Sequence, residues 1–303
     1  MRNYILILFQ ILLITGCRQV SKEELTTRDI ELFKNTIAWD LAQAVDDNNG
    51  EEIEDILKHN PKIVNFQDPI FGTTVLMWAV GSRKYESAKA LLDNGANPNI
   101  ISKTGTTALF RAISFAWNDV EANEDPKFVK LLLDYKANPN INYCEPKTIG
   151  ETSSTECGTS PLIYSINSGF EKVKLLVNAG SIIDYATESG RTAACEALLL
   201  GDVNSAYFLI VKNKAKITAP FYFRSLNEAD TIVFSKPHYP VDLLLDWTFD
   251  LKSSDYQKKK EIIAEFKRQG VDYESRRKYI SKLMLRKIQK LYPNNWQQYL
   301  KKY

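Results

Sequence analysis

The feature that most constrains the fold of this chain is a pattern that occurs four times. Its first half reads GTTVLMWAV from Gly72, GTTALFRAI from Gly105, GTSPLIYSI from Gly158 and GRTAACEAL from Gly190, so successive copies start 33, 53 and 32 residues apart. Each copy has Gly, a Thr or Ser two residues later and an apolar run, and a second apolar stripe such as ESAKALLDNGANPN follows it. A unit this short cannot bury its apolar face alone, so the copies are predicted to stack on one another.

The pattern predicts two helices in each unit. A hydroxyl is placed to cap the start of each first helix, and it belongs to Thr74, Thr107, Ser160 and Thr192. Pro161 stands at an early helical position, where its missing N–H costs nothing. Gly95 and Gly180 are placed to end a second helix, where a left-handed residue is needed, and Lys136 and Lys214 replace that glycine in the other two units.

Together these residues resemble the ankyrin repeat, whose pattern is G-x-T-P-L-H-x-A-A, a turn, a second helix that ends in L-L, and then G-A-x-x-N. The resemblance covers residues 36–274 and implies an all-α solenoid of about six repeats. The first and sixth repeats, Ala38–Asn65 and Tyr239–Glu274, diverge most, as expected of ends that meet water. Ala194 stands where the pattern has Leu.

Extra length interrupts the array in three places, at Ala116–Pro126, Asn142–Gly158 and Ala219–His238. The third insertion reads APFYFRSLNEADTIVFSKPH. It is rich in aromatic and β-branched residues, so it is predicted to form a β-hairpin.

The last segment, 275–303, is not repeat-like. Its apolar residues recur at helical spacing, which predicts an amphipathic helix, and they are Tyr279, Ile280, Leu283, Met284, Ile288 and Leu291. Residues 251–303 hold 15 Lys or Arg against 5 Asp or Glu, although the whole chain has a net charge of only +2. We expect this segment to cap the last repeat, and the alternative is a basic face that lies on anionic lipid.

The N-terminus has the features of an export signal. Residues Tyr4–Ile14 read YILILFQILLI after a single charge at Arg2, which is too short for a membrane-spanning helix but fits a signal peptide. The end of this run, Ile14-Thr15-Gly16-Cys17, resembles the lipobox of bacterial lipoproteins. That resemblance implies a signal peptide at 1–16, lipid on Cys17 and a tether with an N-terminal cap at 17–35. A plain signal peptide with an unrelated Cys is the alternative.

Three further cysteines need a role. Cys144 and Cys157 flank the loop CEPKTIGETSSTEC, and export to an oxidising compartment favours a disulfide between them over two free thiols. Cys195 lies in an apolar helical pattern and is predicted to be a small buried residue.

No pattern for catalysis, cofactor binding or metal binding is present. The chain has two His residues, His59 and His238, and it lacks HExxH, CxxC, P-loop and dinucleotide motifs. We therefore expect no enzymatic activity, cofactor or metal. A nucleic-acid partner is also disfavoured, since an exported protein seldom meets nucleic acid. No small-molecule substrate is expected either, since no catalytic motif is present.

The resemblance implies a protein-binding surface, which in ankyrin arrays is a concave face built from hairpin tips and first helices. Transferred to this chain, the tip positions are Ile70, Phe71, Thr73, Lys103, Thr104, Thr106, Glu156, Thr159, Glu188 and Arg191. The first-helix positions are Ser82, Phe115, Asn167, Ser168 and Leu199. Phe71, Phe115 and Leu199 would be binding anchors if exposed. The alternative is that the insertions cover them.

A lipobox joined to an ankyrin array resembles a group of immunity proteins that neutralise antibacterial phospholipase effectors of type VI secretion. The resemblance implies a protein, monomeric when unbound, that is held by its lipid in a Gram-negative envelope. The side of attachment is expected to be the outer membrane facing the periplasm, with a secreted effector or toxin as partner. A housekeeping envelope scaffold, or an accessory protein to an envelope enzyme, is the alternative.

Overall fold

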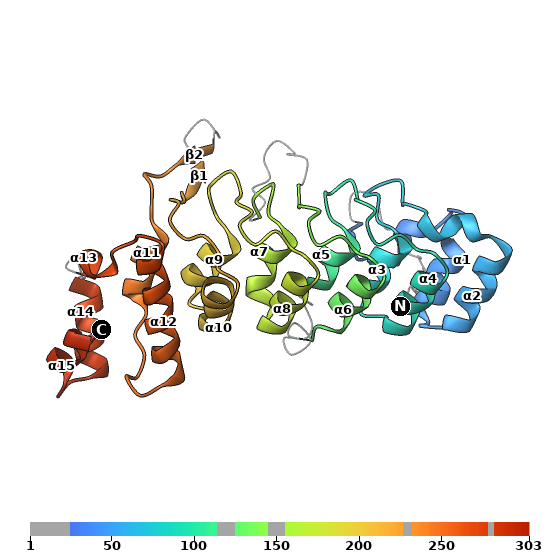
Figure 1. The fold of residues 1–303 in the computed structure, drawn as a ribbon. Coiled ribbons are helices and arrows are strands. Elements are labelled where there is room, and N and C mark those ends of the chain that lie inside the picture. The colour runs from blue at the N-terminus through green and yellow to red at the C-terminus, as the bar shows by residue number, and fades with distance from the viewer. Residues whose placement is uncertain (1–24, 114–124, 145–154, 227–231, 278–281, 303) are drawn as a thin grey trace, which may run out of the picture.

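The fold is a row of helix pairs that stack side by side (Figure 1). A computed structural model describes residues 25–113, 125–144, 155–226, 232–277 and 282–302. The predicted signal peptide, Cys17 and Phe115 lie outside these ranges. Within them, six helix pairs follow one another, and they are α1(Trp39–Asp46) with α2(Gly50–His59), α3(Val75–Gly81) with α4(Tyr85–Asp93), α5(Ala108–Ile113) with α6(Lys127–Asp134), α7(Pro161–Ser165) with α8(Phe170–Asn178), α9(Ala193–Leu200) with α10(Val203–Ala206), and α11(Pro240–Leu243) with α12(Ser254–Arg268). The prediction of an all-α solenoid of six repeats is confirmed.

Several short helical turns extend or connect these pairs. The 3-10 helix η1(Ile30–Phe33) precedes the first pair and buries Leu32 and Phe33 against it. The other short elements are the 3-10 helices η2(Pro61–Asn65), η4(Ile166–Ser168) and η6(Leu244–Asp246) and the π-helix η5(Tyr207–Lys212). Because η5 continues α10, the second helix of the fifth pair keeps a length similar to that of its neighbours.

The capping hydroxyls act as the sequence predicts. Each side-chain oxygen accepts the backbone N–H three residues later, at 3.1 Å for Thr74, 3.4 Å for Thr107, 3.2 Å for Ser160 and 3.1 Å for Thr192. The second helices also end as predicted, since Gly95 and Gly180 have positive φ, and Lys136 and Lys214 take the same conformation with φ of 67° and 59°. A non-glycine residue there is strained, and neighbouring repeats must hold it in place.

Asparagine side chains tie the first four repeats to one another. The Oδ1 atom of Asn140 accepts the backbone N–H of Ile182 at 2.9 Å, and its Nδ2 donates to the Gly180 carbonyl at 3.0 Å. Asn99 and Asn65 make the equivalent bonds one and two repeats earlier. Asp184 takes the same place in the fourth repeat and accepts the Lys216 N–H of the fifth. The Asn or Asp at the last position of the repeat pattern therefore bonds one repeat to the next through its side chain.

One continuous apolar core runs through all six pairs, from Leu32 to Tyr273. The first helices contribute small or branched residues such as Ala79 and Ala112, and the second helices of the first four pairs contribute leucines such as Leu91 and Leu132. Cys195 is buried in this core as predicted, and its burial raises the pKa of the thiol to about 12.

The described part of the C-terminal segment differs from the single helix that its periodicity predicts. Its helices are α13(Tyr273–Arg277), α14(Lys282–Leu291) and α15(Trp296–Lys302), and the chain turns at Pro293 between α14 and α15. Met284 and Ile288 are buried with Tyr299 in a small second core, whereas Leu291 is 53% exposed. The Tyr299 hydroxyl donates to the Phe249 carbonyl at 2.8 Å, which fastens this cap to the sixth pair. The side chains of Tyr279, Ile280 and Leu283 lie outside the described part.

The predicted β-hairpin is present in the third insertion. Strands β1(Arg224–Leu226) and β2(Ile232–Phe234) pair antiparallel, with Ser225 opposite Val233, and an isolated bridge joins Phe221 to His238 at the base. Phe221 is buried, and Phe223 and Phe234 are each 42% exposed. The hairpin rises on the same side of the array as the loops between pairs (Figure 1).

Candidate protein-binding surface

The loops that connect successive pairs project as fingers from one side of the array, and the first helices α3, α5, α7 and α9 lie nearer to them than the second helices do (Figure 1). Each finger is numbered after the pair that it precedes, so the fourth finger lies between α6 and α7 and the fifth between α8 and α9. We call the surface made by the finger tips and these first helices the inner face. It is the surface on which the sequence places a binding site.

Most of the predicted positions reach this surface. Lys103, Asn167 and Glu188 are exposed. The half-buried positions are Ile70, Phe71, Ser82, Thr104, Thr106, Arg191 and Leu199. Ile70 and Phe71 pack partly on the core, so each offers only part of its side chain to a partner. Leu200, next to Leu199, is the more exposed leucine, at 47%.

Four predicted positions are wrong as partner contacts, because Thr73, Glu156, Thr159 and Ser168 are buried. Thr73 is enclosed in the turn of its own finger, where its N–H is bonded to the Asp68 carboxylate. The Thr159 hydroxyl donates to the Glu156 carbonyl at 2.6 Å, and Ser168 ends the short helix η4. These residues shape the fingers and leave other side chains to meet a partner.

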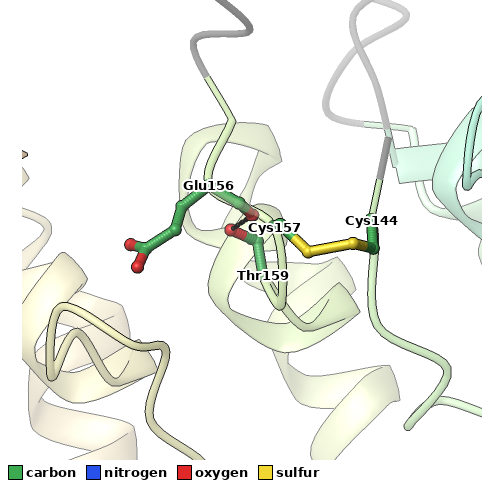
Figure 2. Close-up of a disulfide and its surroundings, with 4 residues drawn as sticks. All are labelled: Cys144, Glu156, Cys157 and Thr159. Carbon is green, nitrogen blue, oxygen red and sulfur yellow. Dashed lines mark hydrogen bonds between the residues drawn. A yellow bond between two sulfur atoms is a disulfide. The ribbon is translucent and has the colours of Figure 1, made fainter. Parts of the chain in front are cut away.

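Glu156 ties two fingers together. Its carboxylate accepts the Ser189 N–H at 2.9 Å and the Ser189 hydroxyl at 2.6 Å, and it also accepts the Thr187 hydroxyl at 2.9 Å. Figure 2 shows this side chain pointing away from the disulfide beside it. A buried carboxylate is favourable only when it is bonded in this way, so Glu156 holds the fourth and fifth fingers in register.

The loop of the fourth finger is closed by a disulfide between Cys144 and Cys157 (Figure 2). The two chain segments also pair through their backbones, because the Tyr143 N–H donates to the Thr159 carbonyl at 2.9 Å and the Gly158 N–H donates to the Tyr143 carbonyl at 2.7 Å. The base of this finger is therefore fixed, and residues 145–154 lie outside the described ranges.

Neighbouring fingers also touch closer to the N-terminus. The Lys103 N–H donates to the Phe71 carbonyl at 2.8 Å, and the Lys103 ammonium donates to the Pro69 carbonyl at 2.6 Å. Gly72 permits this contact, since it has a φ of +67° and a Cβ there would lie 2.9 Å from the Lys103 nitrogen. The finger tips thus form a connected surface.

The inner face has a second row of side chains that the sequence analysis missed. Trp78, Arg111, Tyr164 and Glu196 each follow a capping hydroxyl by four residues, and each donates its backbone N–H to the carbonyl of that capping residue. We call these four residues the inner row. The repeat spacing was the signal that could have found them, because i and i+4 positions share one face of a helix.

The charges of the inner row are not balanced evenly. Glu196 is paired with Arg191. Arg111 forms no ion pair with the described residues, and its Nε is buried without a hydrogen-bond partner. Burial and the nearby Arg28 charge lower the pKa of the Arg111 guanidinium from its ordinary value.

Near the fourth and fifth pairs the turns between first and second helices form an open cleft. It is lined by Ile166, Asn167, Gly169, Phe170, Glu171, Leu200, Asp202 and Asn204. Asn167 is the predicted contact that lies in this cleft. Nothing in its lining resembles a metal site, and the part of the chain that the structure describes has no group of three or more His, Cys, Asp or Glu placed to hold a metal ion.

The family model for ankyrin repeats, in three copies, matches residues 41–143 and 119–220. The chain belongs to the ankyrin-repeat family. Six stacked helix pairs, hydroxyl-capped first helices and connecting fingers agree with this membership.

Two curated ankyrin proteins are similar to part of the chain. A putative ankyrin repeat protein of fowlpox virus, FPV031, is 30% identical over 140 residues, which is 46% of this chain and 37% of that protein. A putative ankyrin repeat protein of Acanthamoeba polyphaga mimivirus, L86, is 36% identical over 155 residues, which is 48% of this chain and 26% of that protein. The matches span less than half the length of either relative.

Family membership makes this chain a protein-interaction module. Ankyrin arrays present a surface built from repeated elements, and the inner face described above is built from such elements. Among the described residues, no helix is both long enough and apolar enough to cross a membrane.

Proposed function

We propose that this ankyrin protein is a lipid-anchored inhibitor in a bacterial envelope, and that it binds and neutralises an antibacterial effector, of the phospholipase type, that acts in the periplasm. The inner face is the observation that carries the proposal. It is a connected row of finger tips, held by Glu156 and by the Cys144–Cys157 disulfide, on a chain with no recognisable catalytic motif. Such a surface suits inhibition by occlusion.

Anchoring is the second part of the proposal. The lipobox-like Ile14-Thr15-Gly16-Cys17 supports lipid on Cys17, and two or more acyl chains hold a protein stably on a membrane. A tethered inhibitor has a raised effective concentration at the lipid surface on which a phospholipase acts. The disulfide is consistent with an oxidising compartment such as the periplasm.

Lipidation is tested by replacing Cys17 with Ala. We expect the wild-type chain to incorporate a fatty-acid probe during growth and the Cys17→Ala variant to incorporate none, because the thiol is the site of attachment. Equal labelling of the two proteins would remove the lipid anchor from the proposal.

Neutralisation is tested in cells that produce the product of the adjacent gene in the periplasm. We expect the wild-type chain to restore growth and the Cys17→Ala chain to restore it less. A neighbour that is not toxic, with no effect of the chain on growth, would instead favour a housekeeping envelope scaffold.

A further inference from the structure

Arg111 is a charged residue of the inner face for which the described residues supply no acidic partner. Its side chain is half-buried on α5, and its Nε is buried without a hydrogen bond. The Nε of Arg191 is also buried without a hydrogen bond, but Arg191 is ion-paired with Glu196 on the same face. A partly buried guanidinium without an ion-pair partner is costly to maintain, because partly desolvated charge is stabilised chiefly by pairing.

Aromatic rings gather around Phe110, the residue that precedes Arg111 on α5. The Phe110 ring lies 5.9 Å from that of Tyr143 and 5.7 Å from that of Tyr164, measured between centroids. Both tyrosines are half-buried. A phenolic hydroxyl is able to donate a hydrogen bond to an anion.

The N-terminal segment brings a second positive charge to the same place. The Trp78 indole N–H donates to the Arg28 carbonyl at 2.9 Å, which fixes the segment beside the inner row. Arg28 is exposed and close enough to Arg111 for the two charges to repel. The site therefore carries two cationic side chains on a face that a protein partner would cover.

We propose that Arg111 binds the carboxylate of an Asp or Glu side chain on a loop of the protein partner. This inference rests on the proposed function, since it names the chemistry by which the inner face recognises its partner. A guanidinium presents two parallel N–H donors that match a carboxylate, and such pairs are stronger where water is excluded. Arg111 is the contact to the carboxylate, and the positive charge of Arg28 adds to the positive potential of this part of the face.

The test uses the purified full-length chain in detergent and a display library of random peptides. Peptides are selected on the wild-type chain and depleted on the Arg111→Gln variant. We expect the survivors to share an Asp or Glu at a fixed position. Survivors without a common acid, or no survivors, would overturn the proposal.

Synthetic survivors then give the energetic coupling. We expect Arg111→Gln to weaken binding at least tenfold, and replacement of the shared acid by its amide to weaken binding to the wild type equally. The two changes together should cost little more than either alone. Independent, additive losses would overturn a direct contact between the two groups.

Two further variants separate recognition from folding. Lys130→Gln, on the second helix of the same repeat, is the matched control and should change affinity less than twofold. Arg111→Lys keeps the charge but not the planar donor pair, so we expect its loss of peptide affinity to lie between those of wild type and Arg111→Gln. A thermal melt shows whether Arg111→Gln is folded, and if it is not, Arg111→Lys still tests the contact. Equal affinity of Arg111→Lys and wild type would contradict recognition by the guanidinium.

The outcome with phosphate identifies the anion. Millimolar inorganic phosphate should displace the peptide only weakly, and the displacement should be no stronger from the wild type than from Arg111→Gln. Strong, Arg111-dependent displacement by phosphate would assign the site to a phosphate group and overturn the assignment to an acidic protein loop.

If the adjacent gene product fails to bind at all, the proposed function fails, whereas the peptide experiment still decides the role of Arg111.

Discussion

Lys172 shows how one residue sets part of the stability of this fold. Its side chain is fully buried on α8, and its ammonium lies 3.4 Å from the Ala112 carbonyl. Burial, with a smaller effect from Arg83, lowers its pKa to about 8. An unfolded lysine has a pKa of about 10.4, so the folded state disfavours the charged form.

We predict that Lys172→Met stabilises the protein at neutral pH by about 1–3 kcal/mol, because it removes a buried charge and keeps the apolar stem. In the wild type the free energy of unfolding should rise as pH increases from about 8 to about 10.4, because in this range Lys172 is protonated more in the unfolded chain than in the folded one. Urea unfolding at several pH values measures both effects.

The control for this variant is Lys130→Met, at an exposed position of α6, which should change stability by no more than about 0.5 kcal/mol. Two results would contradict the prediction and show that the charge of Lys172 is well compensated. One is a Lys172→Met protein that is less stable than wild type at pH 7. The other is a Lys172→Met protein whose stability rises above pH 8 as much as that of the wild type.

For single residues, the sequence predicted the roles of those whose bonding partners are close to them in the chain. The hydroxyl caps were predictable because each bonds an N–H three residues away. Glu156 was assigned to the exposed surface because its partners Thr187 and Ser189 are 31 and 33 residues away, in the next finger. The inner row was missed although its spacing of four residues from each capping hydroxyl is visible in the sequence.

Among the structural elements, the fourth finger is the one that the disulfide controls. The bridge joins residues 13 apart in sequence and closes the loop beside the Glu156 network. Closing a loop of this size restricts the unfolded chain, which is worth about 3 kcal/mol in the chain-entropy model.

We predict that the Cys144→Ser, Cys157→Ser double variant is less stable than wild type by about that amount, as measured by denaturant unfolding. A reducing agent should produce the same loss in the wild type and none in the variant. Peptide mapping of the freshly purified envelope protein without reduction should recover the two linked peptides. Both thiols recovered free would show that the bridge does not form in the cell.

The elements also show where periodicity stops being informative. The stripe after Ser275 predicted helix and buried Met284 and Ile288 correctly, but it did not predict the turn at Pro293 that separates α14 from α15. That turn lets Tyr299 reach the Phe249 backbone, a contact that links positions 50 residues apart. The π-helix η5 was equally invisible, because it has the apolar pattern of an ordinary helix.

The whole molecule is a stack of six ankyrin repeats, and its stability and function follow from the stacking. Asparagine side chains and a shared core bind each repeat to the next, so the finger tips have fixed relative positions. A fixed surface loses little freedom on binding, which favours tight association. The repeat period predicted this architecture from sequence, whereas the identity of the partner depends on the surface that the repeats assemble.

The measurement that tests the central claim most directly is a titration of the adjacent gene product's phospholipase activity with the purified full-length chain. Inhibition by occlusion predicts that activity falls linearly and reaches zero at one equivalent of the chain, without further loss over time. Activity that is unchanged by excess chain would contradict the inhibitor role. Complete inactivation by far less than one equivalent would contradict occlusion and indicate that the chain turns over its target.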